Sequence, residues 1–345
     1  MGINFFTLLL VVIVLAFFID LLTGELPATI HPVVWIGKSI EKVKPVFLSE
    51  SPTKNRFMGF FLTVILLLIF VGGFDAVLII SSFNQILYLV LAVLILSTTF
   101  SVKYLLRSAS EVGYNLAEDL QKGKKAVSFL VSRNTSNLSS QEVVSATIET
   151  LTENLTDSVI APISYSFIFA LIGLFIVSSS QSFPGGFMAH SYQIPILLAV
   201  TAGLIYRVVN TMDAMVGYKD LENIDIGWFP AKLDDCFNYV PARVTGFLMV
   251  VSSFIISLDY KHAWNVMLRE ARNTPSPNSG YPMAAAAGAL NVQLVKPGVY
   301  TLGDSNVPLT NEKINEAIKL STVAISLFLV VIVIILLIVL LCSFQ

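Results

Sequence analysis

Long apolar stretches alternate along the chain with polar segments, and almost every charged residue lies in a polar segment or at its edge. Seven stretches are apolar enough to be candidate membrane helices: 3–22, 57–72, 76–100, 160–179, 194–209, 241–258 and 320–343. Four of them reach the length of about 20 residues that a helix needs to cross a bilayer: 3–22, 76–100, 160–179 and 320–343. The pattern predicts an all-α, polytopic integral membrane helical bundle.

The basic residues predict how the chain is oriented. Lys and Arg concentrate in four loops, 23–56, 101–159, 207–240 and 259–319, whereas the turn 72–75 and the loop 180–193 have none. Loops with an excess of Lys and Arg face the cytoplasm, so we expect the four basic loops to be cytoplasmic. Strict alternation would place 259–319 outside, so we expect 241–258 not to cross fully. The prediction is about six spans plus a possible half-span in the cell membrane.

The composition agrees with this class of protein. Of the 345 residues, 55% are hydrophobic and 13% are charged, against about 25% charged in soluble domains. The net charge of −2 argues against nucleic acid as a partner. Cys236 and Cys342 have no CxxC spacing and are expected to be unpaired thiols. We expect a single membrane-embedded domain over 1–345, with a cytoplasmic insertion at about 101–159.

The insertion is expected to form two helices, and the second carries a row of acids. Ser139 and Glu142 form a capping box at its start. Glu149, Glu153 and Asp157 follow at four-residue spacing, which places them on one helical face. Like charges at this spacing repel, so a cation or a basic substrate group could offset them. The alternative is a solvated acidic face, but this face leads directly into an apolar segment, where carboxylates are costly.

A second cluster lies in 206–243. Arg207, Asn210 and Asp213 fall three residues apart near a predicted helix end, which Gly217 terminates. Further along are Lys232, Asp234, Asp235 and Arg243. Carboxylates with nearby amides suit Mg²⁺, which usually shares its oxygen ligands with substrate phosphates. The basic side chains suit phosphate. Ion pairing at the membrane edge is the alternative interpretation.

Two further segments contain candidate binding residues. In 272–294 prolines and a glycine surround Ser276 and Asn278, which predicts a rigid loop before a helix of small residues. His31 precedes Pro32 in a predicted turn and could be structural or could position a ligand. The chain has no HExxH, GxxxxGK[ST] or GxGxxG motif, which argues against zinc and against the familiar nucleotide sites.

Six motifs, in this order, carry a resemblance to a known family: HPVVWIGK, SRNTSNL, ATIETLTENLTDSVIAP, YRVVNTMDAMVGYK, AKLDDCFNYVPAR and NTPSPNSGYPMAAAAGAL. Together they resemble the adenosylcobinamide-phosphate synthase family, the CobD/CbiB-type membrane proteins of cobalamin biosynthesis. The similarity extends from about Asp20 to Gly303. The chain departs from the family pattern at Asn134, where an Asp often follows the arginine, so Asn134 cannot be a charged ligand.

The resemblance implies an ATP-dependent acid–amine ligase. The expected substrates are adenosylcobyric acid and an aminoalcohol phosphate, either (R)-1-amino-2-propanol O-2-phosphate or ethanolamine phosphate, with ATP as co-substrate and Mg²⁺ as cofactor. The expected product is adenosylcobinamide phosphate. Expected partners are the lipid bilayer and either other late corrinoid-pathway membrane enzymes or a second copy of the chain.

The clusters can be assigned to the needs of that reaction. Mg²⁺ is expected at Asp213, Asp234 and Asp235, and phosphates at Arg207, Lys232 and Arg243. Asn210 belongs with these ligand-binding residues, and Ser276, Asn278 and His31 are expected to position substrate. A base or a second metal site is expected among Glu149, Glu153 and Asp157. The alternatives are a transporter, which would place polar residues in mid-span, and a non-catalytic scaffold for corrinoid enzymes.

Overall fold

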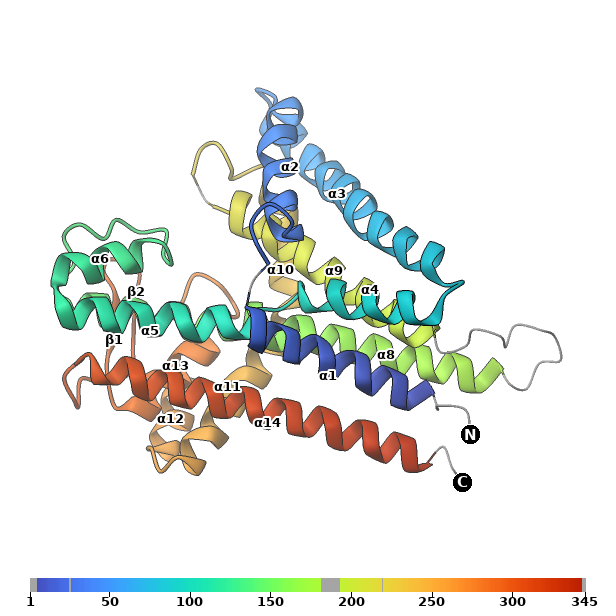
Figure 1. Ribbon diagram of the computed structural model, residues 1–345. Coiled ribbons are helices and arrows are strands. Elements are labelled where there is room, and N and C mark those ends of the chain that lie inside the picture. Colours follow the sequence, from blue (N-terminus) through green and yellow to red (C-terminus); the bar gives the residue numbers. More distant parts are fainter. Residues whose placement is uncertain (1–4, 25, 181–192, 219, 343–345) are drawn as a thin grey trace. The chain divides into compact units, whose positions relative to one another are not determined.

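The computed structural model describes residues 5–24, 26–180, 193–218 and 220–342, and the fold over these ranges is helical (Figure 1). The helices are α1 Phe5–Thr23, α2 Pro32–Phe47, α3 Pro52–Ser81, α4 Gln85–Ser97, α5 Val102–Glu118, α6 Leu120–Ser128, α7 Ser140–Leu155, α8 Ala161–Ser180, α9 Gln193–Val216, α10 Trp228–Phe237, α11 Tyr239–Ile255, α12 Tyr260–Glu270, α13 Gly280–Leu290 and α14 Glu312–Cys342. A π-helical turn, Thr156–Ile160, joins α7 to α8. Strands β1 (Leu294–Lys296) and β2 (Tyr300–Leu302) form an antiparallel hairpin in which Leu294 pairs with Leu302.

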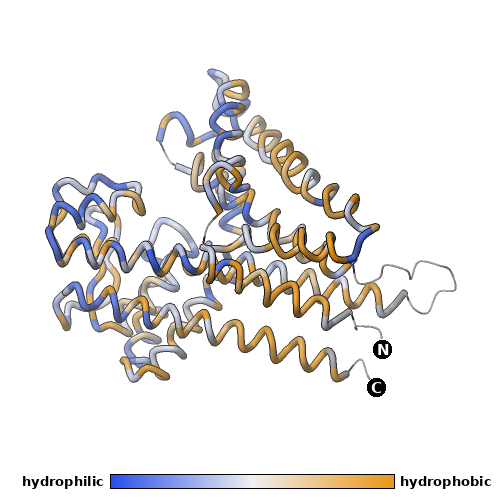
Figure 2. The backbone as a smooth tube through the Cα atoms, viewed as in Figure 1, coloured by the Kyte–Doolittle hydropathy of each residue, from blue (hydrophilic) through white to orange (hydrophobic). Residues whose placement is uncertain are grey.

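Five of the described helical segments are long and apolar enough to cross a membrane: Pro52–Ser81, Gln85–Glu118, Ser140–Ser178, Gln193–Val216 and Glu312–Val339. Thr7–Thr23 and Tyr239–Ile255 are apolar but shorter. Figure 2 shows hydrophobic residues dominating α1, α3 and α4, whereas α5 and α6 are largely polar. The predicted helical membrane bundle is therefore confirmed.

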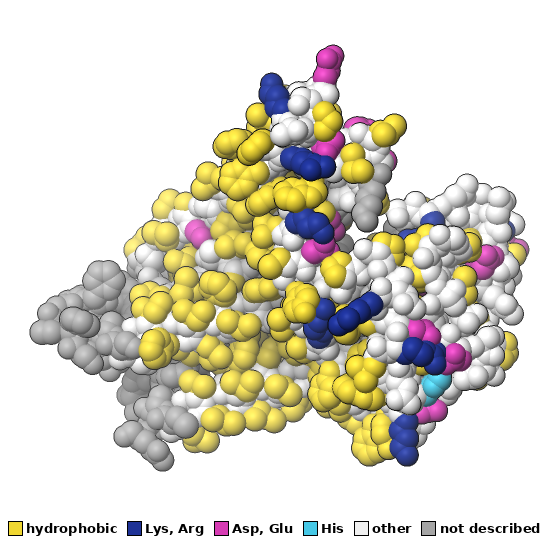
Figure 3. All heavy atoms as spheres, turned by 180° about the vertical axis from the view of Figure 1, so that it is seen from behind, with side chains coloured by type: hydrophobic (Ala, Val, Ile, Leu, Met, Phe, Trp, Pro, Cys, Tyr) yellow, Lys and Arg dark blue, Asp and Glu magenta, His cyan; other side chains and the backbone are white. Residues whose placement is uncertain are grey.

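Large apolar side chains point outward from these helices. Leu68 of α3 is 69% exposed and Phe175 of α8 is 73% exposed, and Figure 3 shows hydrophobic side chains over much of the face that it draws. A soluble monomer rarely exposes contiguous apolar surface on this scale, whereas a lipid-facing helix does so as a rule.

The predicted turn at 72–75 is wrong, because α3 continues through Gly72 and Gly73 to Ser81. Glycine in a helix interior costs only about 1 kcal/mol, and in a long apolar stretch no water competes for the backbone hydrogen bonds. The chain turns instead at residues 82–84. There the Asn84 side chain accepts a hydrogen bond from the backbone N–H of Leu87 and caps α4.

The segment 101–158 forms three helices, where the sequence analysis expected two. The additional break comes at Asp119, whose carboxylate accepts hydrogen bonds from the backbone N–H groups of Gln121 and Lys122 and so begins α6. The predicted capping box at Ser139 and Glu142 is confirmed at the start of α7. Gly217 does follow the last residue of α9, as expected.

The chain forms two compact units. Unit 1 comprises residues 1–101, 162–237 and 332–345, and unit 2 comprises 102–161 and 238–331. The first segment of unit 2 coincides closely with the predicted insertion at 101–159. The single membrane-embedded domain over 1–345 stays a prediction. The predicted loop 180–193 lies almost wholly outside the described residues, as does the side chain of Cys342, while Cys236 is an exposed free thiol.

In unit 1, helix α9 is central and packs against α2, α3, α4 and α10. In unit 2, helix α13 packs against α7, α11 and α12. Every residue of α13 except Tyr281 is buried. Its small residues permit close contact: a Cβ at Gly288 would lie 2.7 Å from the Cα of Ala263. Small side chains at a helix interface let backbones approach in this way.

Candidate functional site

The predicted site residues fall into two groups, one in each unit. His31, Arg207, Asn210, Asp213, Lys232, Asp234 and Asp235 belong to unit 1. Glu149, Glu153, Asp157, Arg243, Ser276 and Asn278 belong to unit 2.

In unit 1 the structure joins three of these residues. The Nη1 of Arg207 donates to the Oδ1 of Asn210 at 3.4 Å, and the Nδ2 of Asn210 donates to the Oδ1 of Asp234 at 3.3 Å. The Nε of Arg207 also donates to the backbone carbonyl of Thr99 at 2.8 Å. Arg207 is 9% exposed and Asp234 is 8% exposed. The guanidinium of Arg207 on α9 and the carboxylate of Asp234 on α10 are thus both buried, and the side-chain amide of Asn210 links them.

The other two acids of this group, Asp213 and Asp235, lie close enough for their charges to interact. Asp235 pairs with Lys232 at 3.2 Å along one face of α10. The Oδ1 of Asp213 lies over Gly217, where a Cβ would approach it to 2.0 Å. A side chain at position 217 would therefore displace the carboxylate of Asp213. From the sequence, Gly217 was expected only to end the helix.

These acids do not form a metal site made of protein ligands alone. Among the described residues, no group of three or more His, Cys, Asp or Glu side chains lies close enough to hold a metal ion. Mg²⁺ usually takes one or two carboxylates together with substrate phosphates. Binding in that mode needs fewer protein ligands, and the metal site expected at Asp213, Asp234 and Asp235 stays a prediction.

His31 begins α2. Its Nδ1 accepts a hydrogen bond from the backbone N–H of Val33 at 3.2 Å, and the ring is buried. The imidazole therefore acts as a helix cap, a role that the His–Pro pair favours because Pro32 needs no backbone donor at the first helical position. Substrate positioning by His31 stays a prediction.

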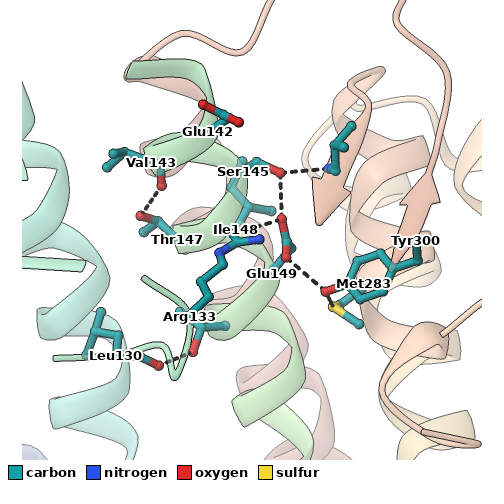
Figure 4. Close-up of polar contacts among 12 residues, drawn as sticks. Leu130, Arg133, Glu142, Val143, Ser145, Thr147, Ile148, Glu149, Met283 and Tyr300 are labelled. Atoms are coloured by element: carbon teal, nitrogen blue, oxygen red, sulfur yellow. Dashed lines mark hydrogen bonds and ion pairs between the residues drawn. The ribbon is translucent and has the colours of Figure 1, made fainter. Parts of the chain in front are cut away.

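In unit 2, Glu149 is the centre of a polar network (Figure 4), and it is buried, with 5% of its surface exposed. Its Oε1 accepts from the hydroxyl of Ser145 at 2.6 Å and lies 3.4 Å from the Nη2 of Arg133. Its Oε2 accepts from the hydroxyl of Tyr300 at 2.9 Å. Ser145 in turn accepts from the backbone N–H of Val295 at 2.9 Å, which ties α7 to β1.

This network fixes the state of the Tyr300 phenol. Burial, reinforced by the charge of Glu149, raises the pKa of Tyr300 well above its ordinary value. The phenol therefore remains a hydrogen-bond donor to the carboxylate. With donors on both oxygens, Glu149 is held in one orientation, and the geometry suits a carboxylate that positions Arg133 and Tyr300. Its predicted role as a base stays a prediction.

The other two acids of the row lie further along the same helix. Glu153 and Asp157 are both partly buried. Asp157 lies in the π-helical turn, which interrupts the regular four-residue spacing expected from the sequence. Single π-helical turns within α-helices are frequent at functional sites, so the turn adds a structural reason to keep Asp157 among the candidates.

The proline-rich loop meets Arg243. The guanidinium carbon of Arg243 lies 3.5 Å from the ring centroid of Tyr239 and 4.3 Å from that of Tyr281. Its Nη1 donates to the Oδ1 of Asn278 at 3.4 Å. Ser276 shapes the loop, because its hydroxyl accepts from the backbone N–H of Asn278 at 3.2 Å. Arg243 and Asn278, which the sequence places in two separate clusters, are thus brought together.

Sequence reasoning missed the partners of these residues. Tyr239 precedes Arg243 by four residues on a helix, so helical spacing could have indicated the stacking. Arg133 stands in a quoted motif, SRNTSNL, but no pattern connects it to Glu149. Tyr300 lies in a strand more than a hundred residues after its partner, and no local signal points to that contact.

Comparison with known proteins gives a consistent result. The family model described as CobD/Cbib protein matches residues 13–328. A probable cobalamin biosynthesis protein CobD of Methanothermobacter thermautotrophicus is 45% identical over 92% of this chain and 94% of its own length. Proteins with the same description from Methanococcus aeolicus (36% identical, 87% and 89% covered) and Methanothrix thermoacetophila (34%, 90% and 91%) are also similar. No solved structure matches the chain.

Proposed function

The chain belongs to the CobD/CbiB family of cobalamin biosynthesis proteins, and on this premise we propose that it is an ATP-dependent ligase. It joins the carboxylate of adenosylcobyric acid to the amine of an aminoalcohol phosphate. The product is adenosylcobinamide phosphate. The observation that carries the proposal is the buried chain Arg207–Asn210–Asp234 in unit 1, because ionisable groups buried in a membrane-embedded unit are costly and are retained for function.

Two steps complete the reaction. A carboxylate oxygen of the corrinoid acid attacks the γ-phosphorus of ATP, the bond to the β-phosphate oxygen breaks, and ADP leaves with an acyl phosphate remaining. The amine nitrogen of the aminoalcohol phosphate then attacks the acyl carbon, and phosphate leaves with the bonding electrons. The proton released from the amine passes to a base. An unactivated carboxylate does not react with an amine at a useful rate, which is why the phosphoryl transfer comes first.

The residues of each cluster suit parts of this task. Arg207 presents a fixed guanidinium to a phosphoryl group, because Thr99 and Asn210 hold two of its nitrogens. Asp213, Asp234 and Asp235 would share Mg²⁺ with the phosphates, and the ion would supply charge neutralisation there. Arg243 lies stacked on Tyr239 and Tyr281 with its guanidinium edge available for the phosphate of the aminoalcohol. Among Glu153 and Asp157, one carboxylate would accept the proton.

Turnover by the purified chain tests the proposal. The full chain in detergent receives adenosylcobyric acid, Mg-ATP and one aminoalcohol phosphate at a time, and the corrinoid product is identified by mass. We expect a new amide that requires both ATP and the aminoalcohol phosphate, and its loss by a factor of about a hundred or more in Asp234→Ala, as expected when a phosphate–metal contact is removed. A folded chain that forms no amide with either aminoalcohol phosphate would contradict the proposal.

The scaffold and transporter alternatives give different results in the same preparation. A non-catalytic scaffold for corrinoid enzymes would keep that scaffolding role in the Asp234→Ala chain. Transport has one structural feature in its favour, Asp75 inside α3, whose carboxylate accepts from the hydroxyl of Thr201 at 2.9 Å. Uptake of corrinoid into vesicles that is abolished by Asp75→Asn, with no amide formed, would favour the transporter.

A further inference from the structure

A pocket of about 620 Å³ opens in unit 2 between the start of α7 and the chain that follows α13. Its lining residues are Ser139, Gln141, Glu142, Ser145, Gln293, Val295, Ser305, Asn306, Val307, Pro308 and Leu309. The volume is in the range of about 300–1,000 Å³ that is usual for small-molecule sites. None of the residues assigned above to catalysis, phosphate or metal lines it, so those roles do not account for it.

The lining that the structure describes is polar but carries no cationic side chain that would attract an anion. It contains no Lys or Arg among the described residues. Its one carboxylate, that of Glu142, accepts from the backbone N–H and the hydroxyl of Ser139, both at 2.7 Å. This capping box occupies the end of α7 that would otherwise attract a phosphate. A nucleotide or a free phosphate is therefore a poor match.

What the lining does offer is amide and hydroxyl groups beside apolar ones. Gln141, Gln293 and Asn306 each carry a carboxamide, which both donates and accepts hydrogen bonds. Val295 and the run 307–309 add aliphatic surface. A carboxamide on a ligand can form a reciprocal pair with a carboxamide of the protein, and an aliphatic frame can pack beside it.

The walls of the pocket are held in place. The Nε2 of Gln293 donates to the carbonyl of Gly303 at 3.3 Å, which leaves its carbonyl oxygen oriented away from that contact. The backbone N–H of Val307 donates to the carbonyl of Asn291 at 3.0 Å and fixes the outer loop. Ser145, at the other wall, is bound to both Glu149 and Val295. The pocket thus shares its rigid frame with the Glu149 network.

We propose that this pocket binds an uncharged ligand edge that bears carboxamide groups on an aliphatic frame. The inference rests on the proposed function, whose corrinoid acceptor is a molecule of this kind, with methyl groups and carboxamide side chains around its ring. The pocket is partly open to the surface, so it takes an edge of the ring and leaves the reacting carboxylate outside. It is the acceptor subsite, distinct from the groups that meet phosphate.

Two corrinoids that differ in side-chain chemistry test the assignment. Dicyanocobinamide carries carboxamides, and dicyanocobyrinic acid carries carboxylates at the same positions. Binding to the full chain in detergent is measured by equilibrium dialysis and the visible absorbance of the corrinoid, without ATP. We expect cobinamide to bind at least about tenfold more tightly, because Glu142 repels carboxylates and no lining cation attracts them.

Variants locate the site. Gln293→Leu and Asn306→Leu replace each carboxamide with a branched alkyl group that has no hydrogen-bonding atoms. Each is expected to weaken cobinamide binding about fivefold, the worth of one ordinary hydrogen bond. The double variant is expected to lose about 25-fold if the two act independently. Gln121→Leu, at an exposed position of α6 outside the pocket, is the matched control and is expected to bind as the parent chain does.

Several results would overturn the assignment: no binding of cobinamide by the parent chain, equal binding of the two corrinoids, or unchanged binding in the double variant. The ligation assay separates this inference from the proposed function. If the parent chain forms the amide and the double variant has the same KM for the corrinoid, the pocket assignment alone is refuted. A chain that binds cobinamide through Gln293 and Asn306 but forms no amide refutes the ligase alone.

Discussion

Replacing Tyr300 with Phe removes one oxygen from the Glu149 network and leaves the ring in place. The lost contact is the 2.9 Å hydrogen bond to the Oε2 of Glu149. Hydrogen bonds to charged groups contribute about 1.5–3 kcal/mol, and this one is buried. With an unfolding entropy of about 2.1 cal/mol/K per residue, the change is expected to lower the Tm of the chain by roughly 2–4 °C.

The measurement is thermal unfolding in detergent, with Tyr260→Phe as the control. Tyr260 lies on the same unit and packs edge-on against Phe254, a ring contact that phenylalanine retains, so its Tm is expected to stay within about 1 °C. A Tyr300→Phe chain as stable as the parent would refute the view that the phenol holds Glu149.

The same phenol predicts a dependence on alkaline pH. The pKa of Tyr300 is raised in the folded chain, whereas in the unfolded chain it is near the ordinary value of about 10. The contribution of the Tyr300 phenol to the free energy of unfolding is therefore fully present below pH 10. It is lost as the pH rises above 10, because only the unfolded state then releases the phenol proton. The parent chain is expected to lose more stability than Tyr300→Phe between pH 9 and pH 11. Parallel pH profiles would contradict this.

Three other substitutions give separate expectations. Gly217→Ala places a Cβ 2.0 Å from the Oδ1 of Asp213 and is expected to lower turnover at least about tenfold in a folded chain, since misplaced catalytic groups cost this much or more; full activity would remove Asp213 from the site. Arg243→Lys loses the planar stacking on Tyr281 and is expected to raise the KM for the aminoalcohol phosphate about tenfold with little change in kcat; an unchanged KM would place that phosphate elsewhere. Gly288→Val meets backbone at 2.7 Å and is expected to destabilise the chain by about 1–3 kcal/mol, measured as a lower Tm; an unaltered Tm would mean that α12 and α13 can separate freely.

The helical class of the fold and the capping residues of its helices were the features most easily predicted from the sequence. Long apolar stretches can bury their backbone only by forming helices in a bilayer, and the capping box at Ser139 depends on residues three apart. The position of the break between α3 and α4 was harder to predict from the sequence. Gly72 and Gly73 suggested a turn, but Asn84, a single capping residue, marks the true start of α4.

Grouping the site residues from the sequence succeeded where spacing along one helix decides proximity. Arg207 and Asn210 are three residues apart on α9, and their contact follows from helical geometry. The link from Asn210 to Asp234 depends on how α9 packs against α10, and the link from Glu149 to Tyr300 depends on where the hairpin lies against α7. Such contacts come from tertiary packing, which a local pattern does not contain.

Isotope transfer tests the central claim most directly. Adenosylcobyric acid labelled with oxygen-18 in its carboxylate is supplied with Mg-ATP and the aminoalcohol phosphate, and the released phosphate is analysed by mass. An acyl phosphate intermediate places one labelled oxygen in the inorganic phosphate for each amide formed. Unlabelled phosphate, label in AMP, or no amide from a folded chain would contradict the account.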